Sequence, residues 1–278
     1  MMFNTRYYFI PIVIHCILQL SLTSVVRAQK IIGDIPLPSS EYKRLTAEPN
    51  SFAQWLRNLT LKKTGSPVLD FRGNVFKSGE DTIVAAVVKW DISGRRLEQC
   101  MDIVIRLYAE YIWNKKEYKG FQLPLPGGTW LSWDEWRAGN RPYFNGLQVN
   151  LKTAEKPDSS YSSFIKYLNI VFSESHTQQF YHSYETVNRR NVQIGDFVVK
   201  KGTKGHAVMI VDLAKNLEGQ LFALIGNGDT PACQFFLLNH TKDNPWIPLY
   251  LDTEVIALPL RRKMTWDGLR RFELPKRD

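Results

Sequence analysis

The segment "IGDFVVKKGTKGHAVMIVDLA", residues 194–214, decides the fold of this chain. It holds two β-prone runs, 197–200 and 206–214, with a glycine-flanked turn between them. A third run, "LFALIG" at residues 221–226, follows after a further turn. Short β-prone runs bounded by turn residues are typical of neighbouring antiparallel strands. We therefore expect an antiparallel meander in this part of the chain.

Upstream of this meander, "LEQCMDIVIRLYAEYIW" at residues 97–113 predicts the main helix. It has acidic residues early and no glycine or proline. Its apolar positions recur at helical spacing, as Met101, Val104, Tyr108 and Ile112. The expected fold class is therefore α+β, an antiparallel sheet packed against the helix that carries Cys100.

Other segments give shorter elements. Residues 51–59 predict a helix capped by Ser51, and residues 159–172 predict another helix. The run "DTIVAAVVKWD", residues 81–91, fits either a buried strand or the start of a helix. Residues 124–150 alternate Pro, Gly and Asn with aromatic residues and predict a long structured loop or hairpin region.

Three tryptophans in this region, Trp130, Trp133 and Trp136, are candidates to line a substrate groove. The alternative is that they cap the hydrophobic core beneath a long loop, and this alternative is favoured.

The N-terminus is typical of a secretory signal peptide. A short basic start is followed by an apolar run, and the small residue Ala28 ends the predicted cleavage site. A retained membrane anchor is the alternative, which Pro11 and Gln19 disfavour. We expect a signal peptide at 1–28, a flexible segment at 29–40, one globular domain at 41–278, and a periplasmic or secreted protein with no stable membrane span.

The chain of 278 residues has a formal net charge of +9, and removal of Arg6 and Arg27 with the signal peptide leaves +7. A basic exported protein is expected to contact anionic envelope polymers or peptides. No aromatic-basic pattern indicates nucleic-acid binding. No HExxH or CxxC motif is present, so we expect no metal and no cofactor.

The mature chain would keep two cysteines, Cys100 and Cys233. In an oxidising compartment such a pair is first a candidate disulfide. The alternative is that Cys100, near a helix N-terminus, is a nucleophile. His206 opens a predicted strand and would be its base, and Asn227 ends the next strand and would orient the imidazole. Gln99, or the backbone amide of Cys100, would stabilise an oxyanion.

Strings such as "LEQCMDIVIRLYAEYIW", "WRAGNRPYFNG" and "IGDFVVKKGTKGHAVMIVDLA" resemble a family of exported bacterial proteins of unknown function, over about residues 42–251. In this resemblance the family's Gln-Cys pair falls on Gln99 and Cys100, and its Gly-His-Ala-Val element on residues 205–208. The second element is also similar to the histidine region of NlpC-type, papain-like cell-wall peptidases. The resemblance implies an amide in the role of Asn227 and no partner cysteine at Cys233.

The leading hypothesis is an exported thiol hydrolase, a peptidase or amidase acting on cell-envelope peptides through Cys100, His206 and Asn227. The competing hypothesis is a non-catalytic envelope- or glycan-binding protein with a structural Cys100–Cys233 disulfide and a tryptophan contact surface.

Overall fold

The computed structural model describes residues 1–2, 30–242 and 244–273. The predicted signal peptide lies outside the described residues apart from its first two, so export stays a prediction. Among the described residues, no helix has both the length and the apolar character needed to cross a membrane.

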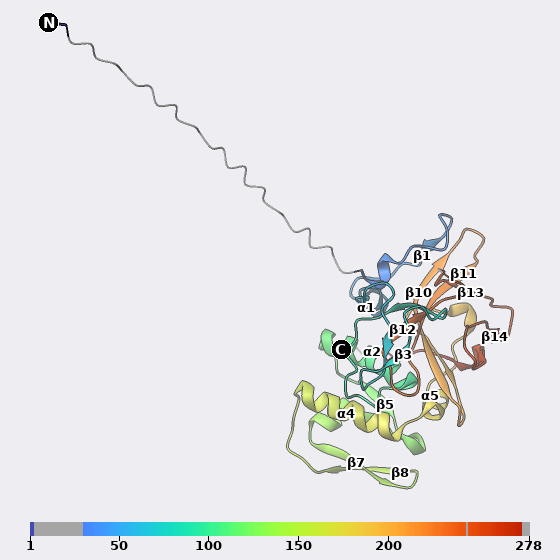
Figure 1. Cartoon of the computed structure of the whole chain (residues 1–278). Helices are drawn as coiled ribbons and strands as arrows, with labels where there is room; N and C mark the ends of the chain where they lie inside the picture. Colours follow the sequence, from blue (N-terminus) through green and yellow to red (C-terminus); the bar gives the residue numbers. More distant parts are fainter. Residues whose placement is uncertain (3–29, 243, 274–278) are drawn as a thin grey trace.

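An antiparallel sheet forms the centre of the fold (Figure 1). Its strands follow the order β16 (Leu269–Arg270), β9 (Phe197–Lys200), β10 (His206–Lys215), β11 (Leu221–Asn227), β12 (Phe236–Leu238) and β4 (Val84–Val87). In addition, β1 (Lys43–Arg44) pairs with β10 and β13 (Ile247–Leu249) with β11. The meander predicted from residues 194–226 is confirmed as β9, β10 and β11. The ambiguous run at 81–91 is a strand, β4.

Five α-helices occur among the described residues: α1 (Phe52–Arg57), α2 (Cys100–Lys115), α3 (Trp133–Arg137), α4 (Tyr161–Glu174) and α5 (Thr177–Ser183). Small hairpins pair β2 (Val68–Leu69) with β3 (Val75–Lys77), β5 (Gln122–Pro124) with β6 (Trp130–Ser132), β7 (Asn140–Asn145) with β8 (Gln148–Thr153), and β14 (Val255–Ile256) with β15 (Met264–Thr265). Short 3-10 turns are η1 (Ile32–Asp34), η2 (Pro126–Gly128), η3 (Arg189–Asn191) and η4 (Trp266–Gly268). The fold is thus mixed helix and antiparallel sheet, as the α+β expectation stated.

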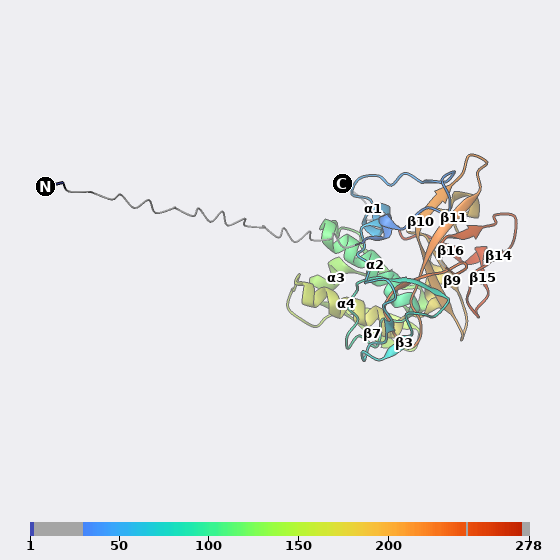
Figure 2. The same ribbon diagram turned by 45° about the horizontal axis from the view of Figure 1, so that its top comes forward.

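The sheet is buried on both faces, because side chains along a strand alternate between them. In β10, Ala207, Met209 and Val211 pack into the larger core with the helices. Val208 and Ile210 pack into a second core that includes residues of β14 and β15. Figure 2 shows α2, α3 and α4 on one side of the sheet and β14–β15 on the other. This double burial explains why β10 reads as a continuous apolar run.

The main helix, α2, begins at Cys100, three residues later than the predicted start at Leu97. It is buried on nearly all sides, from Cys100 through Ile112. Its charged Arg106 is therefore paired on both sides, 2.5 Å from Glu98 and 2.6 Å from Glu110. Buried charges are stable only when they are paired in this way. The pair with Glu98 holds the segment that precedes α2 against the helix.

The first described residues of the domain differ from the sequence-based expectation, whereas the hairpins predicted as one alternative for residues 124–150 are present. The described part of the predicted flexible segment, residues 30–40, contains η1, and Ile32 is fully buried in the core. The apolar Ile32 side chain gains free energy by leaving water, which anchors the segment. Residues 124–150 form successive hairpins with α3 between them, because Ser132 caps that short helix by accepting from the amide of Glu135.

Candidate functional site

Cys100 is the first residue of α2, and the residues around it fix that helix end. The backbone N–H of Gln99 donates to Oδ2 of Asp102 at 3.0 Å, and the amide of Ile103 donates to the Gln99 carbonyl at 2.9 Å. This is the capping-box arrangement of a helix N-terminus. As the first helical residue, Cys100 has a backbone N–H with no partner inside the helix. That N–H is suited to stabilise an oxyanion.

The sulfur of Cys100 lies against the start of β10. The backbone N–H of Ala207, the residue after His206, lies near the sulfur and lowers the pKa of the Cys100 thiol, against the larger effect of burial. Gly228 makes the approach of helix and sheet feasible: a Cβ there would lie 2.6 Å from a methyl carbon of Ile103, too close for any side chain. The helix N-terminus therefore docks where β11 ends, and the Cys100 sulfur is within one residue of His206.

His206 and Asn227 form a hydrogen-bonded pair in the interior. Nε2 of His206 lies 2.8 Å from Oδ1 of Asn227, and both side chains are fully buried. An amide oxygen can only accept, so Nε2 carries the proton and Nδ1 keeps its lone pair. Among the described residues, Nδ1 of His206 has no hydrogen-bond partner. The predicted base and orienter are thus brought together, with the basic nitrogen free.

The protonation states follow from burial. Burial is the largest cause that lowers the pKa of His206, and the hydrogen bond that its ring donates to Asn227 opposes this effect. Burial likewise raises the pKa of Cys100 to about 11, and Asp102 and Asp229 raise it further by charge. At neutral pH the pair is therefore a neutral thiol beside a neutral imidazole. The side chains of Cys100 and His206 are not hydrogen-bonded to each other in the described residues.

A short loop after β11 links the two halves of this site. The hydroxyl of Thr230 donates to Oε1 of Gln99 at 2.7 Å, so the loop is attached to the residue before Cys100. Between Asn227 and Thr230, the carboxylate of Asp229 lies 3.2 Å from the guanidinium of Arg262. Asp229 and Arg262 are functional candidates that sequence reasoning missed. A contact between side chains so far apart in the sequence leaves no local pattern.

The two cysteines are free and buried, so the Cys100–Cys233 disulfide considered from the sequence is not formed in the structure. Cys233 is nevertheless close, since the charge of an ionised Cys100 raises its pKa. Burial is the main cause that raises the pKa of Cys233 to about 12. Neither thiol is ionised at rest near neutral pH.

The three tryptophans do not line an exposed groove. Trp133 and Trp136 are 1% and 3% exposed, and Trp130 is half-buried beside Tyr184. Trp133 packs edge-on against Phe164, and the indole nitrogen of Trp136 donates to Ser163. Large aromatic surfaces gain most by burial, which is why these rings join the core. The alternative stated from the sequence, that they cap the core, describes their position.

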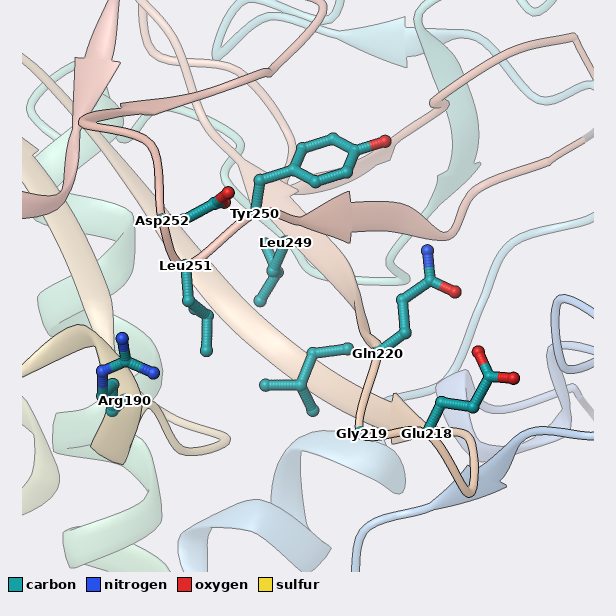
Figure 3. Close-up of a pocket in the computed structure, with 9 residues that line it drawn as sticks. Arg190, Glu218, Gly219, Gln220, Leu249, Tyr250, Leu251 and Asp252 are labelled. Atoms are coloured by element: carbon teal, nitrogen blue, oxygen red, sulfur yellow. The ribbon is translucent and has the colours of Figure 1, made fainter.

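A surface depression lies elsewhere in the molecule (Figure 3). It has a volume of about 500 Å³ and is very open. Leu249 and Leu251 point into it, while Tyr250 points away, as Figure 3 shows. It lies beside Leu221, at the opposite end of β11 from Asn227. It is separate from the Cys100 site. In the described part of the chain, no three His, Cys, Asp or Glu side chains gather as metal ligands.

Comparison with known proteins gives one family. A family model described as "Domain of unknown function (4846)" matches residues 32–265. No curated protein matches, and no solved structure matches. The likeness of residues 205–208 to NlpC-type peptidases therefore has no support from these comparisons.

Proposed function

The chain belongs to the family of domain of unknown function 4846, so its activity must be argued from its own residues, and we propose that it is a thiol hydrolase cleaving amide bonds in cell-envelope peptides. Cys100 is the nucleophile, His206 the base and Asn227 the orienter. The proposal includes a papain-like arrangement of these residues on the α+β fold, and export to the periplasm or medium.

One observation carries the proposal. Nε2 of His206 is held by Asn227, Nδ1 is left without a partner among the described residues, and the amide of the adjacent Ala207 lowers the pKa of the nearby Cys100 thiol. A buried imidazole with one nitrogen oriented and the other basic is what a general base requires. A histidine with only a structural role would be expected to have both ring nitrogens paired when fully buried.

The neutral thiol and imidazole define the order of proton transfers. As the Cys100 sulfur attacks the substrate carbonyl carbon, Nδ1 of His206 takes the thiol proton. The backbone N–H of Cys100, with Gln99, stabilises the oxyanion. His206 then gives the proton to the departing amine, and a thioester forms on Cys100. Water, deprotonated by His206, cleaves the thioester and restores the thiol.

The test compares the mature protein with Cys100→Ala and, as a matched control, Cys233→Ala. Both cysteines are buried, so each substitution removes a thiol of the same kind. We expect Cys100→Ala to abolish release of peptides from isolated envelope material and Cys233→Ala to retain it. Equal digestion by the Cys100→Ala variant and the unmodified protein, with both folded by circular dichroism, would refute the hydrolase.

Export is tested separately. Mass spectrometry of the protein recovered from periplasm or medium is expected to show a chain that begins at Gln29. A chain that keeps residues 1–28 and fractionates with cytoplasmic proteins contradicts this part of the proposal.

A further inference from the structure

Arg262 lies at the rim of the Cys100 site. It belongs to the segment between β14 and β15, and its side chain is 36% exposed. Within the residues the structure describes, its guanidinium makes one polar contact, a 3.2 Å approach to Oδ1 of Asp229. A guanidinium has five N–H donors, so the donors beyond this contact have no protein partner among the described residues.

The geometry connects this cation to the reacting groups. Asp229 follows Asn227 by two residues, and Asn227 holds His206 at 2.8 Å. The next residue, Thr230, is bonded to Gln99, which precedes Cys100. Arg262 is thus attached to the middle of the loop between Asn227, which holds the proposed base, and Thr230, which is bonded to the residue before the proposed nucleophile. Its charge lowers the pKa of His206 and that of Asp229 raises it, so both act on the imidazole.

The chemistry of the pair indicates what Arg262 recognises. A planar guanidinium binds carboxylates through two parallel N–H donors. Asp229 occupies one donor through one oxygen and is itself only 16% exposed. The remaining donors of this partly exposed side chain can bind a second carboxylate. The proposed substrates are peptides, whose anionic groups are carboxylates.

We propose that Arg262 binds a carboxylate of the substrate, so that the site selects peptides with a free acidic group next to the scissile amide. The inference rests on the proposed hydrolase for the reaction it serves. Its binding step is tested without catalysis.

The probes are two isosteric peptides, acetyl-Ala-Glu-Ala-Ala-amide and acetyl-Ala-Gln-Ala-Ala-amide. Their affinities are measured by calorimetry at low salt with Cys100→Ala, which cannot cleave them. We expect the glutamate peptide to bind about tenfold tighter. Adding Arg262→Gln is expected to bring the ratio of the two peptide affinities close to one. Adding Arg261→Gln, which removes the neighbouring exposed arginine, is expected to keep it.

The absence of an Arg262-dependent preference, including failure of both peptides to bind, overturns the inference. If Arg262→Gln weakens the binding of both peptides equally, the inference is also overturned, because that result indicates a structural role for Arg262. Hydrolysis assays with Cys100 intact separate the two proposals. Arg262-dependent binding without cleavage refutes the hydrolase and supports the carboxylate site. Cleavage without preference for glutamate supports the hydrolase and refutes the carboxylate site.

Discussion

The imidazole of His206 donates from Nε2 to Oδ1 of Asn227 across 2.8 Å, between the ends of two adjacent strands. Replacing Asn227 with Leu removes the acceptor, so the proton of the neutral imidazole is no longer held on Nε2 of His206. We expect kcat for peptide hydrolysis to fall by about 10²–10⁴-fold, the range for loss of a general base, with KM little changed. Asn227→Asp keeps an acceptor and is the matched variant. An unchanged kcat in Asn227→Leu would mean that the pair is structural.

The reactivity of Cys100 is expected to follow its raised pKa. Because burial raises that pKa to about 11, alkylation by iodoacetamide should increase about tenfold per pH unit from pH 8 and level off near pH 11. Cys233, with a pKa raised to about 12, should react more slowly throughout. Mass mapping of labelled peptides measures both rates. A plateau for Cys100 below pH 8 would contradict the buried neutral thiol.

Asp102 contributes to that raised pKa through its charge. An asparagine at this position keeps an oxygen that can accept from the amide of Gln99, so the helix start is preserved. We expect Asp102→Asn to move the alkylation midpoint of Cys100 to lower pH. Asp134, a partly exposed residue that forms an ion pair with Arg137 on α3, supplies the control, and Asp134→Asn should leave the midpoint unchanged. A midpoint that rises in Asp102→Asn would show that the carboxylate acts otherwise.

His206 makes the folded state sensitive to acid. Burial lowers its folded-state pKa below the ordinary value of 6.5, so below pH 6.5 the unfolded chain binds the proton more readily. The free energy of unfolding should therefore fall as pH drops from 6.5 through the folded-state pKa. In His206→Gln this dependence should shrink, and the exposed His240→Gln should keep it. Urea denaturation at pH 7 and pH 5 measures how much the free energy of unfolding changes between the two pH values. An equal change in the unmodified protein and both variants would argue against a neutral buried His206.

The tryptophans are expected to act on stability. Trp133 is 1% exposed among aromatic neighbours, so Trp133→Ala should lower the free energy of unfolding by about 3–5 kcal/mol. Trp130→Ala, at a half-buried position, should cost clearly less. Chemical denaturation monitored by circular dichroism tests this. Equal losses for the two variants would contradict the core assignment.

Much of the fold could be read from local pattern. Strands buried on both faces gave continuous apolar runs, and α2 combined apolar periodicity with an absence of Gly and Pro. The predicted pair of His206 and Asn227 depended only on adjacent strand ends, which a meander brings together. The start of α2 was misplaced by three residues because Leu97 continues the apolar pattern, whereas capping by Asp102 sets the first helical residue.

What could not be read depends on contacts distant in sequence. The Asp229–Arg262 pair joins a strand end to a different hairpin, and neither residue belongs to a recognisable motif. The burial of Trp133 and Trp136 depends on α4 packing over them, which the turn-rich composition of residues 124–150 does not indicate.

The docking of the α2 N-terminus where β11 ends has a consequence for biosynthesis. Cys100 leaves the ribosome well before His206 and Asn227, and contacts of such long sequence separation form late because loop closure costs entropy. Until β10 and β11 pair and receive the helix, the thiol has no base beside it. A chain that lacks β10 or β11 therefore cannot bring Cys100, His206 and Asn227 together, and the proposed hydrolase activity would require the finished sheet.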